Sequence, residues 1–407
     1  MSSPSTVSGD NFYDYYNRFN DLIREQTWAA GELLAELFSC QDSHAQSPNF
    51  QIADIEDDYQ DRNVNSNVFD DMVAIHCRVL YFLSKNEPIE AYAAQTALVQ
   101  YYNKEILVKE KDANWFIPIL TTICRDLRII ASMADKDREI IDEEEKSFYE
   151  EAAEPIMESF RTCVTEGRNA IEVTKKIAIM SLANQLFRIY LRINRPHLFK
   201  PLIRAIDQAE NLNSHFEMAD KVTYKYFVGR KAIFDNDLKL ANEALSFAFT
   251  NCPSKFAKNK RLILIYLVPV KMFFGFMPNQ KLLEEYNLSC FKKLVLAVRE
   301  GNVSRLIQAL QEQETFFIDY GIFLLVEKLK LTTFLNLIKI AHKILKSPQI
   351  KLDAIVTILK NTNVVMDNDE VGCHLANLIS QKKMKGYISY NHQTLVLSKA
   401  DPFPTPI

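Results

Sequence analysis

The stretch Ile350–Ser398 carries three periodic patterns in a fixed order, and these constrain the fold more than any other part of the chain. Apolar residues recur at helical spacing in one segment and again in a second segment, which Gly386 is expected to end. Tyr387–Ser398 then alternates around Asn391-His392, which predicts a β-hairpin. The apolar positions of the two helices are Leu352, Ile355, Val356 and Leu359, then Val371, Leu375, Leu378 and Ile379.

A third helix of the same kind is predicted upstream, over Phe334–Leu345. Helix, short strand, helix, turn, helix and hairpin is the element order of a winged helix. Its core requires all three apolar faces together, because neither a short lone helix nor a lone hairpin is stable. We therefore predict one small sheet, confined to Ile350–Ser398.

Glycine is scarce, which favours long helices with short connections. The chain has only 9 glycines in 407 residues, about a third of the usual ~7% share. No G-x-G-x-x-G or G-x-x-x-x-G-K-[ST] motif occurs, so phosphate-cradling loops of those types are excluded. The fold class predicted is mainly α: a right-handed, tetratricopeptide-like helical solenoid that ends in the winged helix.

The helical pattern divides the chain into four regions. Residues 1–63 are predicted to hold N-terminal helices and a polar linker, and residues 64–330 the solenoid. Residues 331–400 form the winged helix, and residues 401–407 a tail. Within the solenoid, one helix is expected over Lys258–Phe274 and another over Phe316–Leu329. The apolar run Leu262–Met277 is too short to span a membrane and predicts a buried helix.

Charge is unevenly distributed although the net charge is only −4. Residues 134–166 contain twelve acidic and four basic residues, whereas residues 339–399 contain nine lysines and four acids. A solvated face explains the acidic segment most simply, and a partner with a basic groove is the alternative. The basic C-terminal face is compatible with nucleic acid, although the whole chain is not a polycation.

No residue pattern predicts an enzyme, a metal site or a cofactor. The seven cysteines contain no C-x-x-C pair and are expected to be reduced thiols of an intracellular protein. The seven histidines are scattered, and no H-E-x-x-H or G-x-S-x-G motif occurs. Asp367, in a D-x-D pair with Asp369, is better explained as a helix N-cap. An active site that forms only in the folded chain is the remaining alternative.

Several C-terminal segments resemble the PCI domain-containing protein 2 family. They are Glu370-Val371, Leu375–Ile379, Lys385–Ser389, Leu395–Lys399 and Asp401–Pro404. Asn259–Leu267, followed by Pro269–Met272 and Gly275, resembles the same family in register. The likeness extends from about Asn67 to the C-terminus. It implies a PCI domain whose helical part begins near residue 200.

The resemblance implies a non-enzymatic scaffold subunit of a complex that couples transcription to messenger-RNA export at the nuclear pore. The partners would be a GANP-type large scaffold subunit and a small, acidic, disordered subunit shared with the proteasome lid. The expected compartment is the nucleus, with the cytoplasm as a second one. The alternative is a PCI subunit of a proteasome-lid or signalosome-type assembly, which co-purifying partners would distinguish.

Two groups of residues are the predicted binding sites. Polar and basic residues at the end of the last helix and on the wing are expected on the surface, where they would contact RNA or DNA phosphates without sequence preference: Asn377, Gln381, Lys382, Lys383, Lys385 and Lys399. His374 belongs to the same polar face. Basic residues at the start of the long apolar helix would steer the acidic subunit: Lys255, Lys258, Lys260 and Arg261. For both groups the alternative is ordinary solubilising charge.

Overall fold

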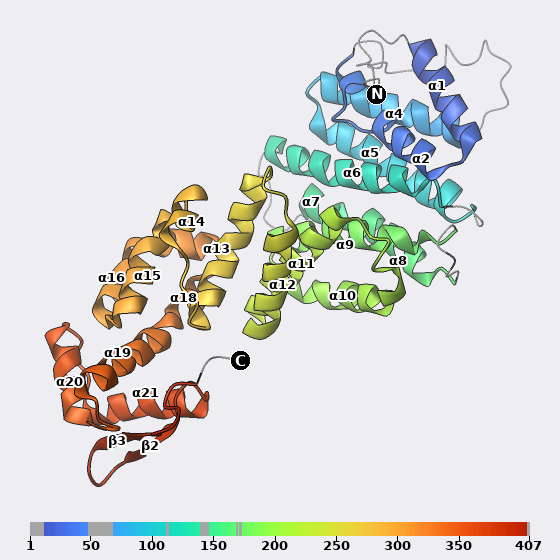
Figure 1. Cartoon of the computed structure of the whole chain (residues 1–407). Coiled ribbons are helices and arrows are strands. Elements are labelled where there is room, and N and C mark those ends of the chain that lie inside the picture. Colours follow the sequence, from blue (N-terminus) through green and yellow to red (C-terminus); the bar gives the residue numbers. More distant parts are fainter. Residues whose placement is uncertain are drawn as a thin grey trace. The chain divides into compact units, whose positions relative to one another are not determined.

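The computed structural model describes residues 12–47, 68–110, 114–138, 146–167, 170 and 173–404. The chain divides into two compact units, Met1–Phe227 and Val228–Ile407 (Figure 1). Each unit is helical, and one three-stranded sheet lies near the C-terminus, so the predicted fold class is confirmed. In the described residues, no helix has both the length and the apolarity required to cross a membrane.

Unit 1 is built from helices that bury apolar faces against one another, and α6 lies at its centre. Its elements are α1 (Phe12–Glu25), α2 (Trp28–Leu37), η1 (Ser43–Gln46), α4 (Val68–Ser84), α5 (Pro88–Tyr102), the π-helical turn η3 (Asn103–Leu107), α6 (Ile117–Asp137), α7 (Phe148–Glu151), α8 (Ala153–Thr165), η4 (Lys175–Ala178), α9 (Ile179–Arg192), η5 (Pro196–Leu198), α10 (Phe199–Gln208), η6 (Glu210–Leu212) and most of α11 (Met218–Phe234).

The N-terminal helices belong to the core of unit 1. Phe19 of α1 and Phe38 after α2 are fully buried, with ring centroids 5.9 Å apart. The backbone N–H of Cys40 donates to the buried Asp126 carboxylate of α6 at 2.8 Å. Gly31 lies so close to the loop before α6 that a Cβ there would be 1.7 Å from the Trp115 carbonyl oxygen. The polar linker predicted after these helices falls largely on residues 48–63, outside the described residues.

Unit 2 continues the helical stack and adds the winged helix. Its elements are α12 (Leu238–Asn251), α13 (Ala257–Phe273), α14 (Gln280–Glu285), η7 (Ser289–Phe291), α15 (Lys292–Glu300), α16 (Val303–Glu312), α17 (Glu314–Asp319), α18 (Phe323–Glu327), α19 (Leu329–Leu345), β1 (Gln349–Lys351), α20 (Leu352–Asn361), α21 (Asn368–Ser380), β2 (Gly386–Ser389) and β3 (Thr394–Leu397). As predicted from its apolar surface, α13 is buried along most of its length.

The single helix predicted over Phe316–Leu329 is wrong. The chain forms two short helices there and then enters α19, which begins earlier than the Phe334 start predicted for it. Gly321 interrupts the pattern with φ +66°, a left-handed conformation that glycine adopts without steric cost. A second left-handed residue, Gly301, lets α19 pack against the end of α15. A Cβ at Gly301 would lie 2.6 Å from the backbone nitrogen of Leu337.

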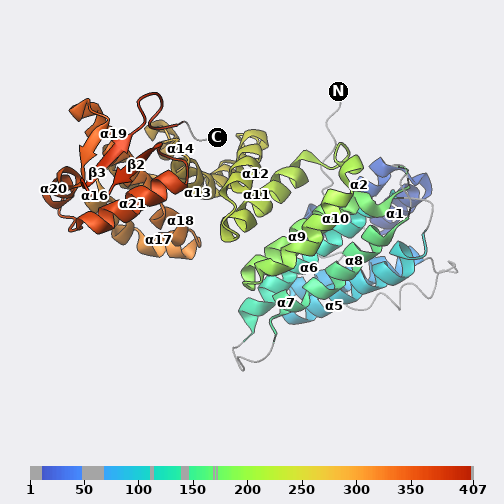
Figure 2. The same ribbon diagram turned by 90° about the horizontal axis from the view of Figure 1, so that it is seen from below.

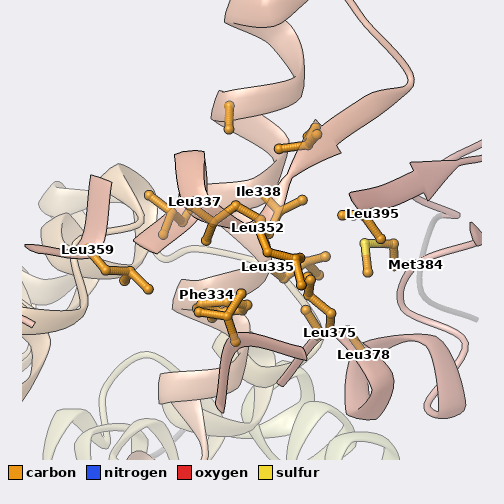
Figure 3. Close-up of a cluster of buried hydrophobic side chains, with 14 of the residues drawn as sticks. Phe334, Leu335, Leu337, Ile338, Leu352, Leu359, Leu375, Leu378, Met384 and Leu395 are labelled. Atoms are coloured by element: carbon orange, nitrogen blue, oxygen red, sulfur yellow. The ribbon is translucent and has the colours of Figure 1, made fainter. Parts of the chain in front are cut away.

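The winged helix shares one apolar core with α19 (Figure 3). The three-stranded sheet has the order β1-β3-β2, and both pairings are antiparallel. Most buried members of the core come from α19, β1, α20, α21 and β3, and they include Ile338, Ile350, Ile355, Leu375 and Leu395. Full burial of an aliphatic side chain of this size is worth ~1.5–3 kcal/mol. The winged helix therefore depends on α19, which it shares with the solenoid.

Candidate nucleic-acid interface

Helix α21 begins and ends with local hydrogen bonds that set the direction of its polar residues. Asp367 is the N-cap, as predicted: its carboxylate accepts from the Glu370 N–H at 2.8 Å, and the Glu370 carboxylate accepts from the Asp367 N–H at 3.1 Å. The helix ends at Ser380, six residues before the predicted end at Gly386. Figures 1 and 2 both show α21 alongside the β2–β3 hairpin.

The end of α21 is a Schellman motif built around a lysine. Lys382 has φ +56° and donates its N–H to the Ile379 carbonyl, while the Lys383 N–H donates to the Leu378 carbonyl. Glycine usually occupies the left-handed position of this motif. The sequence offered no glycine there, which is why the helix appeared to continue to Gly386.

This turn directs Lys383 inward, so the prediction that all four lysines lie on the surface is wrong for this residue. Its Nζ is buried, has no hydrogen-bond partner, and lies 3.6 Å from the centroid of the Phe273 ring in α13. Burial lowers the pKa of Lys383 from 10.5 to about 8. An ammonium group in this position cannot contact a phosphate without leaving the ring.

The remaining predicted residues lie on the surface and differ in whether their side chains form an ion pair. Lys382 and Lys399 are exposed and have no salt bridge in the described part of the chain. Lys385 is also exposed, but its Nζ is 2.6 Å from a carboxylate oxygen of Asp401. Asn377 of α21 and Gln381, which caps its C-terminal end, are exposed, as predicted.

His374 does not join this polar surface. Its ring is half-buried and lies against the Phe334 ring of α19, with centroids 5.3 Å apart. The helical spacing that grouped His374 with Asn377 places the two side chains on adjacent parts of α21. The surface that α21 presents to solvent is therefore narrower than predicted.

The sheet presents a second surface, which we call the open face, on the side away from the core. Its members alternate with the residues of each strand that face the core: Gln349 and Lys351 of β1, Thr394 and Val396 of β3, and Tyr387 and Ser389 of β2. The register aligns Gln349, Val396 and Tyr387 in one row and Lys351, Thr394 and Ser389 in the next.

Sequence reasoning missed the aromatic part of this region. Tyr387 on the open face is 62% exposed, and Tyr390, in the turn between β2 and β3, is 72% exposed. Most of the apolar area of each ring is therefore exposed to water, although an aromatic ring gains stability when it is buried. The alternation of Tyr387–Ser398 is the available signal in the sequence, but it predicts strands without showing which face of the sheet the core covers.

The predicted partner-binding residues lie at the start of α13, where an aromatic residue accompanies them. Lys255 and Lys258 are exposed, and the Lys255 Nζ lies 5.0 Å from the ring centroid of Phe256, itself 47% exposed. The Lys260 Nζ lies 4.7 Å from the ring centroid of Phe249. Arg261 is half-buried and lines a hollow of about 300 Å³ with residues that include Cys290, Lys293 and Glu312.

The arrangement of titratable groups does not indicate catalysis. In the described residues, no three His, Cys, Asp or Glu side chains are grouped so as to hold a metal ion. Burial raises the pKa of Cys77 and of Cys124 to about 12, so these thiols are not activated nucleophiles. A hollow of about 610 Å³ lies in unit 1 and is lined by Trp28, Arg125, Asp220 and neighbouring residues. Burial raises the pKa of the Asp220 carboxyl above its usual value.

Comparisons with known proteins identify the family. Residues 277–399 match the model of the PCI domain. The chain is 45% identical to a PCI domain-containing protein 2 homolog of Caenorhabditis elegans over 398 residues, which covers 96% of each chain. It is also 45% identical to PCI domain-containing protein 2 of Danio rerio, with 92% of this chain and 93% of the relative covered.

A more distant relative has a different name. The enhanced ethylene response protein 5 of Arabidopsis thaliana is 31% identical over 404 residues, which covers 96% of this chain and 94% of the relative. Likeness over nearly the whole chain, together with the PCI-domain match over the winged helix, agrees with the resemblance drawn from the C-terminal segments. The chain belongs to the PCI domain-containing protein 2 family.

Proposed function

We propose that this protein is a non-enzymatic scaffold subunit of a nuclear-pore-associated complex that couples transcription to messenger-RNA export. Family membership supports the proposal, since the resemblance implies this role for members of the family. The observation that carries it is the pair of basic, partly aromatic surfaces in unit 2: one at the start of α13, the other around the end of α21. Surfaces of this kind bind partners and do not perform bond chemistry.

The basic start of α13 is the proposed docking site of the small acidic subunit. A disordered acidic chain gains from steering by positive charge and from exposed aromatic area on which to settle. Four consecutive residues provide the charge and the aromatic area together, through Lys255, Lys258 and the Phe256 ring. Arg261 extends the charge to the rim of the adjacent hollow, which also holds Lys293. The large scaffold subunit is the second proposed partner.

Co-expression with the acidic subunit tests this site. Replacing Lys255, Lys258, Lys260 and Arg261 by glutamate should abolish recovery of the complex. A control variant with the same charge change in unit 1 should retain it, at the exposed residues Lys136, Arg161, Lys200 and Arg204. Equal recovery of both variants would exclude the site. Co-purification with proteasome-lid or signalosome subunits, and not with export factors, would contradict the proposed complex.

The surface around the end of α21 is the proposed site for nucleic acid. Within the described residues Lys382 and Lys399 have no salt bridge, whereas Lys385 must first leave Asp401. Each phosphate that a lysine neutralises changes the slope of log affinity against log salt by roughly 0.7–0.9. Glutamate at these three lysines should weaken binding of both RNA and DNA by the assembled complex. If the three lysines are replaced by alanine, the salt slope should fall by at most the contribution of about three phosphate contacts. Unchanged slopes would place the nucleic acid elsewhere.

A further inference from the structure

The open face of the sheet has the composition of a stacking platform. It carries Tyr387, one lysine and four uncharged residues, and no carboxylate is among its six members. Tyr390 lies one residue beyond the end of β2, in the turn to β3 and outside the alternation that places Tyr387 on the open face, and both tyrosine rings are mostly exposed. Aromatic rings held on a sheet lose little further conformational freedom on binding, because a tyrosine has only two side-chain torsions.

We propose that the open face, together with Tyr390, binds single-stranded nucleic acid by stacking bases on Tyr387 and Tyr390. This inference rests on the proposed nucleic-acid function and adds the class of ligand. Lys351 lies in the row next to Tyr387 and is exposed, so it can reach a phosphate of the same strand. The open face then binds bases and phosphate, while Lys382, four residues before β2, and Lys399, two residues after β3, add positive charge next to the strands in sequence.

The geometry selects a single strand over a duplex. Base pairs in a duplex are stacked on one another and offer their faces to a protein ring only at an end or after unpairing. The sheet spans roughly 10 Å between its outer strands, at ~4.8 Å per strand spacing, and roughly 13 Å along four residues. Sheets of slightly greater width stack two or three bases on aromatic residues. The open face with Tyr387 accommodates one unpaired base, and the Tyr390 ring in the adjoining turn offers a second stacking surface to the next base of the strand.

The same composition argues against a protein as the ligand of the open face. Protein interfaces have an apolar centre from which charged residues are depleted. Here the central strand contributes Thr394 and a half-buried Val396, with Gln349, Ser389 and Lys351 around them. Tyr387 is the only large apolar group of the face. Such a surface suits a polar, anionic ligand with flat apolar rings.

The test measures binding of the full chain to two fluorescent probes of equal length, a single-stranded oligouridylate and a blunt RNA duplex. The variants are Tyr387→Leu and Tyr390→Leu, with Tyr387→Phe and Tyr390→Phe to retain each ring without its hydroxyl. Phe276→Leu is the matched control, because Phe276 is 56% exposed in the same unit but lies outside the sheet. Far-UV circular dichroism verifies that each variant is folded.

Each leucine variant is expected to weaken single-strand binding about tenfold, as loss of one base–aromatic stack does. Duplex binding, both phenylalanine variants and the Phe276→Leu control should be unchanged. The salt slope of the leucine variants should equal that of the wild type, because no charge is removed. The lysine variants of the proposed function should instead lower the slope for both probes.

Three results would overturn the inference. If the leucine variants bind the single strand as the wild type does while the lysine variants bind weakly, the nucleic-acid function stands and the stacking platform does not. If the leucine variants lose partner assembly and retain RNA binding, the open face is a protein surface. If the wild type binds neither probe, alone or in the assembled complex, the proposed nucleic-acid function fails and the platform fails with it.

Discussion

Replacing Lys383 by methionine is expected to stabilise unit 2 at neutral pH. The Lys383 Nζ is buried without a hydrogen bond, and burial lowers the pKa of the side chain from 10.5 to about 8. This fall in pKa corresponds to a cost of at most about 3.4 kcal/mol, at 1.36 kcal/mol per pH unit. Methionine retains an unbranched, adaptable side chain over the Phe273 ring and removes the charge.

The net gain is smaller than that upper limit. The side chain is partly exposed, so solvent screening reduces the cost to roughly half. The Phe273 ring, 3.6 Å from Nζ, offsets roughly 1 kcal/mol of the remainder by attracting the ammonium group. We therefore expect the free energy of unfolding to rise by about 1 kcal/mol in Lys383→Met. The exposed Lys399→Met control should change it by less than about 0.5 kcal/mol.

The advantage of methionine should depend on pH. Below pH 8 the lysine is charged in both states, so the folded state bears the full cost of burial. Between about pH 8 and 10.5 the unfolded chain holds a proton that the folded chain has lost, so the stability of the wild type rises with pH. The difference between the wild type and Lys383→Met should therefore shrink across this window.

Urea unfolding of the full chain, followed by two signals, measures the effect. Both tryptophans, Trp28 and Trp115, belong to unit 1, so tryptophan fluorescence reports that unit. Far-UV circular dichroism reports both units, and a transition without a fluorescence counterpart belongs to unit 2. A Lys383→Met protein that is less stable than the wild type by 1 kcal/mol or more would show that attraction by the ring outweighs desolvation, and would refute this reasoning.

Three further predictions use the same unfolding measurement. Gly301→Ala should lower the free energy of unfolding by ~2–4 kcal/mol, because the new Cβ would meet the backbone of α19. Gly275→Ala, at φ +89° but in open space, should lower it by only about 1 kcal/mol, and equal losses would mean that α19 moves freely. Asp367→Ala should cost about 1 kcal/mol through loss of the N-cap, and the nearby Asp369→Ala should cost less; the reverse order would exclude the capping role. A fragment that begins at Lys330 should aggregate or remain unfolded, because it exposes the face of α19 that packs against Gly301 and Val303; a stable monomer would contradict the shared core.

The winged helix was predictable because its signals are local. Apolar spacing predicted α20 and α21, and Asp367 was correctly predicted as the N-cap of α21. Gly321 is a sequence signal for a break inside Phe316–Leu329, although the apolar spacing there favours one continuous helix.

The candidate site was less predictable, because the direction of a side chain depends on distant packing. Lys383 points inward since Lys382 takes a left-handed conformation that local sequence does not favour, and since Phe273, 110 residues earlier, offers a ring. The exposure of Tyr387 follows from strand register and from which face α19 covers. Hydrophobic spacing alone predicts neither the direction of Lys383 nor the exposure of Tyr387.

Helix α13 gives unit 2 a built-in spacing between its two proposed surfaces. Lys258 lies in the first turn of the helix and Phe273, which holds Lys383 beneath the end of α21, is its last residue. Seventeen residues at 1.5 Å per residue separate the two ends by roughly 25 Å. The helix would thus keep an acidic chain bound at one end and a nucleic-acid strand bound near the other at a fixed distance. Two ligands joined by a tether much shorter than this span could not occupy both surfaces at once.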